Sequence, residues 1–390
     1  MLSLLLPLIY VSFISLGLPD AMLGAAWPSM SLTVGRSLSD LGLVSMISTL
    51  GAVTSSLLSS RLIERFGTGR VMVGSVLLTA LGLVFYSFSR SYFMVCLLAL
   101  PLGMGGGAVD SGLNGFVARN YKASHMSWLH FMWGVGATLG PLIIGASIKL
   151  TGSWPRGYLT AGIIQGALLA ILLFSLPLWK KAESQELHDF GAPKKLSLQG
   201  LMKTPGLKTT MLAFFCMVGF EYTGSVWAAS FLEEQKGFDA AASALLSSIY
   251  FFGTTFGRGV SGFVAMKIDS RRMIRYGLCL AFFGALLLAL PLPREAALAG
   301  YLFLGLGNAP IFPSMSFLVP QRFGANLSQA VIGMSTAAAY FGSTLMPPLT
   351  GLIVKGASLK VVPFMLLLLI AAAWFFTERI DRRTGSIQKA

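Results

Sequence analysis

Long apolar runs, each separated from the next by a short polar or charged stretch, repeat along the whole chain. A helix needs about 20 apolar residues to cross the hydrocarbon core of a bilayer. Only helices and closed barrels satisfy their backbone hydrogen bonds there, and these runs lack the two-residue alternation of barrel strands. The pattern therefore predicts an all-α membrane protein with twelve transmembrane helices. The predicted spans cover residues 2–30, 39–60, 71–89, 92–118, 125–149, 157–179, 207–232, 240–265, 273–293, 296–320, 325–352 and 358–377.

One long polar stretch divides these spans into two sets of six. It covers residues 180–206 and holds both basic and acidic side chains. We interpret it as a cytoplasmic linker between an N-terminal six-helix bundle, residues 1–179, and a C-terminal one, residues 207–378. Residues 379–390 form a predicted cytoplasmic tail.

Composition supports lipid as the solvent. Hydrophobic residues make up 55% of the 390 residues and charged residues 11%, whereas a soluble domain carries about 25% charged residues. The formal net charge of +14 raises the possibility of nucleic acid as a partner. The basic residues, however, are spread over short loops, so we expect no nucleic-acid binding. The three cysteines lie inside apolar runs without metal-ligand or disulfide spacing, so we expect no metal and no cofactor.

Basic residues also predict the orientation of the chain in the membrane. Of the 29 lysines and arginines, eight fall in the loops on one side and 21 on the other, if Arg258 is counted with the second group. Cytoplasmic loops carry the excess of Lys and Arg. We therefore expect both termini in the cytoplasm, and we expect a monomer in a bacterial cytoplasmic membrane. The first apolar run has no basic region before it and is interpreted as an uncleaved span.

The two halves carry matching residues at a nearly constant offset. Gly24 and Trp27 in the first span match Gly224 and Trp227 in the seventh, an offset of 200. A Gly-x-Gly pair starting at Gly103 in the fourth span matches the pair at 305–307, an offset of 202. Such offsets indicate that the bundles are pseudo-symmetric repeats of one another.

The loop after the second span resembles a transporter signature. Residues 60–70 read SRLIERFGTGR, which is similar to the G-x-x-x-D-[RK]-x-G-x-[RK]-[RK] motif of the major facilitator superfamily. Ser60 replaces the first glycine, Glu64 the aspartate and Gly69 one of the closing basic residues. The resemblance implies the twelve-helix fold of that superfamily and alternating access between two bundles. It also implies a cytoplasmic gate, for which our candidate residues are Glu64, Arg65, Gly67, Arg70 and Arg258.

Two further motifs point to different branches of that superfamily. Residues 17–28 in the first span and 103–114 in the fourth contain acidic residues, Asp20 and Asp110, and are similar to the fucose-permease-like sugar–proton symporters. Residues 136–145 in the fifth span, GATLGPLIIG, are similar to a motif of drug–proton antiporters. The arginine that such antiporters carry four residues before Gly103 is Ala99 here.

Three acidic residues lie inside predicted spans, namely Asp20, Asp110 and Glu221. A charge at bilayer depth costs about 3 kcal/mol, so it is retained where it faces a cavity or a partner. Asn114 lies four residues after Asp110 and shares its helix face. His130 in the fifth span could pair with Asp110. We therefore predict that these five residues bind protons or substrate, with structural hydrogen bonding as the alternative for each.

Aromatic residues in the same spans could stack on a sugar ring. Asp20 lies at helical spacing from Trp27, which would place a carboxyl group beside an indole plane. Each of these aromatic residues could equally be a packing residue. The candidate stacking residues are Trp27, Trp133, Trp227, Tyr250 and Tyr340.

These features lead to one main functional hypothesis and two others. The main hypothesis is a secondary active transporter that moves a small polar solute, a sugar, together with protons. The alternative is a proton-driven efflux antiporter for amphipathic compounds, which the motif at residues 136–145 favours. A lipid scramblase or a membrane enzyme is a remote alternative. The chain shows no clustered His, Asp and Glu motif near one interface, so we predict no catalytic residues.

Overall fold

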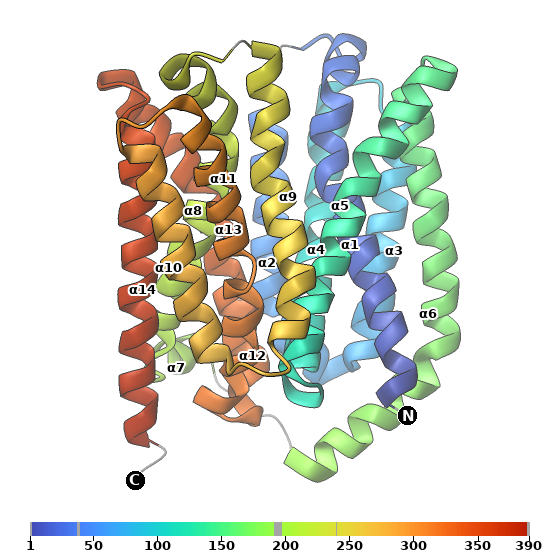
Figure 1. Cartoon of the computed structure of the whole chain (residues 1–390). Helices are drawn as coiled ribbons and strands as arrows, with labels where there is room; N and C mark the ends of the chain where they lie inside the picture. The colour runs from blue at the N-terminus through green and yellow to red at the C-terminus, as the bar shows by residue number, and fades with distance from the viewer. Residues whose placement is uncertain (1, 37–39, 191–196, 239, 388–390) are drawn as a thin grey trace. The chain divides into compact units, whose positions relative to one another are not determined.

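The computed structural model describes residues 2–36, 40–190, 197–238 and 240–387, and these residues form helices joined by short connections (Figure 1). The helices are α1 (Leu2–Thr33), α2 (Leu41–Phe66), α3 (Thr68–Ser87), α4 (Tyr92–Asn120), α5 (Ala123–Thr151), α6 (Trp154–Phe190), α7 (Leu198–Met202), α8 (Leu207–Lys236), α9 (Ala240–Val264), α10 (Ser270–Ala289), α11 (Arg294–Asn308), α12 (Ile311–Phe323), α13 (Ala325–Gly356) and α14 (Val361–Ile387).

The predicted all-α membrane fold is confirmed. Every predicted span coincides with a helix, except that the tenth is divided into α11 and α12 at Ala309 and Pro310. The short α7 lies in the predicted linker, and α6 continues eleven residues into it, from Lys180 as far as Phe190. Residues 191–196 of the linker and 388–390 of the tail lie outside the described residues.

Eleven helical segments among the described residues are long and apolar enough to cross a membrane, with α11 and α12 together forming one of them. Helix α9 is not among the eleven, although its 25 residues are long enough. Helix α9 has two different faces. Large apolar side chains such as Phe252 and Phe263 are exposed on one side, whereas Tyr250, Thr254 and Arg258 are buried on the other. We assign α9 as the twelfth span, with a polar face that packs inside the protein.

The helices form two compact units. Unit 1 contains Met1–Phe116, Leu129–Lys194 and Ala325–Gly333; unit 2 contains Val117–Trp128, Lys195–Gly324 and Met334–Ala390. The start of α13 thus packs with unit 1, where Gln329 Nε2 donates a hydrogen bond to the Ser111 carbonyl at 3.0 Å. The predicted boundaries at residues 179 and 207 stay a prediction.

Repeated glycines mark equivalent helix crossings in the two units. Gly103 of α4 lies against the backbone carbonyl of Ser48 in α2, and Gly305 of α11 lies against that of Tyr250 in α9. A Cβ atom at either glycine would collide with the carbonyl oxygen. Small residues allow such close approach of backbones in membrane helices. The offset of 202 in the sequence therefore corresponds to one packing solution used twice.

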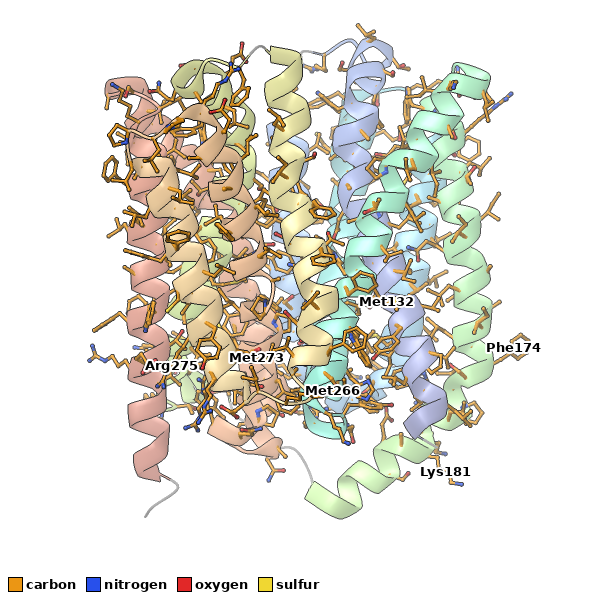
Figure 2. All side chains as sticks on the ribbon, viewed as in Figure 1. Met132, Phe174, Lys181, Met266, Met273 and Arg275 are labelled. Atoms are coloured by element: carbon orange, nitrogen blue, oxygen red, sulfur yellow. The ribbon has the colours of Figure 1, made fainter. Side chains whose placement is uncertain are left out.

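Each unit has its own buried core and an apolar outer surface. In unit 1, Met22 and Trp27 of α1 pack with Leu83 of α3. On the outer face of α6, Phe174 points away from the helix and is 87% exposed (Figure 2). Side chains like Phe174 match lipid rather than water, which explains why so much apolar surface remains uncovered by protein.

We predict that Gly136→Ala in α5 lowers the stability of the protein, because its methyl group would collide with the Ile14 carbonyl of α1. Overpacking of this kind costs about 1–3 kcal/mol. Gly145→Ala is the matched control, since it lies on the same helix with nothing within 4 Å of the added Cβ. Thermal unfolding in detergent should show a melting temperature lower by several degrees for the first variant only. Equal melting temperatures for the two variants would contradict the close α1–α5 contact.

Candidate functional site

Asp20 lies near the middle of α1 and is exposed at the surface of unit 1. Its Oδ2 atom accepts a hydrogen bond from Trp133 Nε1 of α5 at 2.8 Å. A carboxylate facing lipid at this depth would cost about 3 kcal/mol, so we infer that this part of the unit faces water. Trp133 was predicted to stack on the substrate. In this structure its indole edge orients the carboxyl group.

Asp110 of α4 belongs to a chain of polar side chains that reaches α5. Asp110 Oδ1 accepts from Asn114 Nδ2 at 2.7 Å, and Asn114 Oδ1 lies 3.0 Å from His130 Nε2. A carboxylate can only accept, so the amide nitrogen of Asn114 must face Asp110 and its oxygen must face His130. His130 therefore carries its proton on Nε2. The predicted link between Asp110 and His130 thus runs through Asn114, which is fully buried.

Glu221 of α8 forms an ion pair with Arg258 of α9 inside unit 2. The Glu221 Oε1 and Arg258 Nη2 atoms are 3.1 Å apart, and the side chains are 16% and 6% exposed. Arg258 was predicted to belong to the cytoplasmic gate. In this structure it pairs with a mid-span acid, and a role in the gate stays a prediction. The pair also explains how a charged α9 can lie in a membrane, because each charge neutralises the other.

The other predicted stacking residues have varied surroundings. Trp27 is buried in the core of unit 1, with its ring edge-on to Tyr92 at 6.3 Å between centroids. Trp227 of α8 donates to the Pro347 carbonyl of α13 at 3.2 Å. Tyr340 is partly exposed in α13, and Tyr250 is buried in α9. The burial of Trp27 and Tyr250 favours packing, and stacking by any of the four stays a prediction.

The predicted gate loop connects α2 to α3. Glu64, Arg65 and Arg70 are exposed, and Gly67 has a positive φ of 82° that favours glycine. The first backbone N–H groups of α3, those of Thr68 and Gly69, donate to the Glu183 carboxylate of α6. An acidic group at the start of a helix satisfies unpaired donors and complements the helix dipole. The loop is thus attached to the part of α6 that extends into the predicted linker.

Glu183 and Asn308 were missed as candidates at the sequence level. Glu183 looked like one of many linker charges, and only the unusual glycines of the loop hinted at a close neighbour. Asn308 ends α11 just before Pro310 and is fully buried. Among the described residues, no three His, Cys, Asp or Glu side chains come together as metal ligands.

Comparison with known families agrees with this architecture. The family model of the Major Facilitator Superfamily matches residues 9–335 and 210–389. The chain belongs to this superfamily. It is therefore a transporter of the major facilitator type and an integral membrane protein.

Several curated proteins are similar over most of the chain. Bypass of stop codon protein 6 from Saccharomyces cerevisiae is 22% identical, covering 93% of this chain and 79% of the yeast protein. The glucose/mannose transporter GlcP from Bacillus subtilis is 22% identical over 88% of this chain and 86% of its own. Sodium-dependent glucose transporter 1A from Mus musculus is 24% identical over 68% of this chain and 70% of its own.

Solved structures share the fold at low sequence identity. FucP in the outward conformation has a TM-score of 0.77 at 12% identity, covering 96% of this chain and 98% of FucP. The human organic anion transporter MFSD10 has a TM-score of 0.76 at 17% identity, with coverage of 96% and 98%. The proton:xylose symporter XylE has a TM-score of 0.77 at 13% identity, with coverage of 96% and 95%.

The ion pair in unit 2 gives a stability prediction. Arg258→Met leaves Glu221 as a buried charge without its counter-ion, which costs about 3–5 kcal/mol. Replacing both residues, Glu221→Leu with Arg258→Met, should cost less than the single change, because no charge remains buried. Thermal unfolding of the two variants in detergent measures the difference.

The matched control is Arg275→Met, which breaks the pair between Arg275 of α10 and Glu378 of α14 (Arg275 is labelled in Figure 2). Those side chains are 50% and 29% exposed, so the loss should stay below about 1 kcal/mol. An Arg258→Met protein as stable as Arg275→Met would contradict the buried ion pair.

Proposed function

We propose that the transporter moves a small sugar together with protons by alternating access. The observation that carries this proposal is the contrast between the mid-span acids. Asp20 and Asp110 are held by neutral donors, the indole of Trp133 and the amide of Asn114, at 2.8 and 2.7 Å. A carboxyl group that accepts hydrogen bonds from neutral donors can keep them when it gains a proton, because its carbonyl oxygen still accepts. Glu221 differs, because its carboxylate pairs with the guanidinium of Arg258. We therefore assign Asp20 and Asp110 as the proton carriers and Glu221 as a substrate ligand.

A sugar as substrate is supported by the chemistry of the site and by the names of similar proteins. Carboxylate and amide groups hydrogen-bond hydroxyls, and aromatic rings pack on the C–H faces of a sugar. Two similar curated proteins are named as glucose transporters, and XylE is a proton:xylose symporter. These names support the fucose-permease-like branch that the motifs in α1 and α4 indicate.

The drug–proton antiporter is the second candidate. Gly136, Gly140 and Pro141 in α5 carry the antiporter-like motif. Against it, Ala99 stands where such antiporters have an arginine, and this alanine is buried in the core of unit 1. Coupling to sodium is a further possibility, because the mouse relative is named as sodium-dependent.

The orientation and the gate belong to the same proposal. With both termini in the cytoplasm, the loop that holds Glu64, Arg65, Gly67 and Arg70 lies on the cytoplasmic side. There its charges would latch neighbouring helices in one of the two access states. The attachment of this loop to Glu183 would link the latch to the chain between the two bundles.

Proteoliposomes with a pH-sensitive dye inside separate these candidates. A sugar symporter acidifies the lumen when sugar is added outside, whereas an antiporter makes it more alkaline when its substrate enters in exchange for protons. Repeating the assay with and without a sodium gradient at constant pH tests sodium coupling. Sugar entry that follows only the sodium gradient would contradict proton coupling.

We predict that replacing both proposed proton carriers, Asp20→Asn with Asp110→Asn, removes accumulation of the sugar while sugar exchange across the membrane continues. The amide resembles the protonated acid in shape, but it cannot release and rebind a proton. The pH gradient therefore no longer drives uptake. For each proton moved with the sugar, a gradient of one pH unit supports about tenfold accumulation in the original protein, and none in the double variant. Asp269→Asn, at the start of α10 and outside the spans, is the control that retains accumulation. Full accumulation by the Asp20→Asn/Asp110→Asn double variant would contradict the carboxyl mechanism.

A further inference from the structure

The tenth span is interrupted in the middle of unit 2. Helix α11 ends at Asn308 and α12 begins at Ile311 (Figure 1). Pro310 and Pro313 have no N–H, so the carbonyl groups of Leu306 and Ala309 lack the donors that a continuous helix would supply. Within a membrane, such backbone is tolerated where protein, water or a ligand satisfies the carbonyl groups. The break therefore marks a polar spot within an apolar span.

Asn308 adds a polar side chain at this break. The residue is fully buried, and neither its Oδ1 nor its Nδ2 atom has a hydrogen-bond partner in the described part of the chain. Its amide offers two donors and one acceptor oxygen. Burying these atoms without partners is unfavourable, so a group that is not part of the protein is expected to meet them at some stage of transport.

The packing of α11 on α8 locates this amide. Leu304 lies one turn before Asn308, and its Cδ2 atom is 3.1 Å from a Cβ built on Gly224 of α8. Helices α8 and α9 run antiparallel, because Glu221 meets Arg258 while Gly224 meets Tyr250. Helices α9 and α11 run parallel, so α8 and α11 are antiparallel. Asn308 therefore lies opposite the turn of α8 that holds Glu221.

The packing of α11 on α9 agrees with this placement. A Cβ on Gly257 of α9 would lie 2.7 Å from the Ala309 side chain, and Arg258 is the next residue of α9. Glu221, Arg258 and Asn308 thus come from three helices of unit 2 at one level. Together they offer a carboxylate, a guanidinium and an amide, and the two charges cancel.

We propose that Asn308, together with the Glu221–Arg258 pair, forms a hydroxyl-binding subsite of unit 2 for a neutral polyhydroxy solute. This inference rests on the proposed function and names the residues through which the C-terminal bundle holds the sugar. A cation or an anion would find no net charge here. Adjacent hydroxyl groups, in contrast, both donate and accept, which matches the amide and carboxylate together. A site that hydrogen-bonds a hydroxyl rejects an analogue that lacks it.

The test uses the purified full chain and the tightest binder among D-glucose, D-mannose, D-xylose and L-fucose, with the monodeoxy analogues of that sugar. Asn308→Leu should weaken binding about tenfold. Its melting temperature without sugar should be unchanged or higher, because an unpaired buried amide is removed. One monodeoxy analogue should bind the original protein about tenfold more weakly than the parent sugar. That analogue and the parent sugar should bind Asn308→Leu equally.

Tyr301→Phe is the matched control. Tyr301 is a fully buried residue of the same helix, and its hydroxyl has no hydrogen-bond partner among the described residues. Its substitution should leave sugar affinity unchanged, which separates loss of a ligand contact from loss of any buried polar atom.

Three results would overturn the subsite. A lower melting temperature for Asn308→Leu with unchanged affinity would show that Asn308 holds a structural water. An equal loss of affinity for every deoxy analogue in the variant would show an indirect effect. If the original protein binds none of the four sugars, the proposed function fails, and the subsite fails with it. That failure is recognisable because it is seen before any substitution is made.

Discussion

Lipid offers no hydrogen bonds, so every polar group inside a span must find a partner in the protein or face water. This constraint shapes both units. Gln165, a polar residue in the middle of α6, donates to the Ser15 carbonyl at 2.6 Å and accepts from the Ser15 hydroxyl. One amide thereby joins α6 to α1 with both of its polar ends used. Against that background, the charged and unpaired groups identify the parts of the molecule that do more than hold helices together.

The two units meet the constraint with different chemistry. In unit 1 the mid-span acids accept hydrogen bonds from an indole and an amide, which are neutral donors. In unit 2 the mid-span acid pairs with a guanidinium. A pseudo-symmetric backbone therefore carries an asymmetric division of labour, with proton exchange proposed for unit 1 and solute contacts for unit 2. The glycine crossings are shared because they serve packing, and the side chains at the acids differ because they serve chemistry.

The helices could be predicted because apolar length is a local property of the sequence, and the repeated glycines could be matched because they keep their offset. Partners could not be predicted in the same way. Glu221 and Arg258 are 37 residues apart on different helices, and nothing local connects them. Asn308 reads as a single polar residue at the end of an apolar run. What distinguishes it is its place, a buried amide at the break in the tenth span and at the level of the Glu221–Arg258 pair, which only packing reveals. The break at Pro310 was visible as prolines, but a proline alone also fits a continuous, kinked span.

The departure of the gate loop from its signature motif also has a physical origin. Where the motif has a basic residue, this chain has Gly69, and a Cβ there would lie 2.6 Å from the Trp179 Cβ of α6. The Trp179 ring in turn packs on Phe116 of α4, with 5.2 Å between ring centroids. A basic side chain at position 69 would displace this tryptophan, so the loop is braced by packing and by the Glu183 carboxylate instead. At position 69, packing against Trp179 of α6 thus takes the place that the motif gives to a basic side chain.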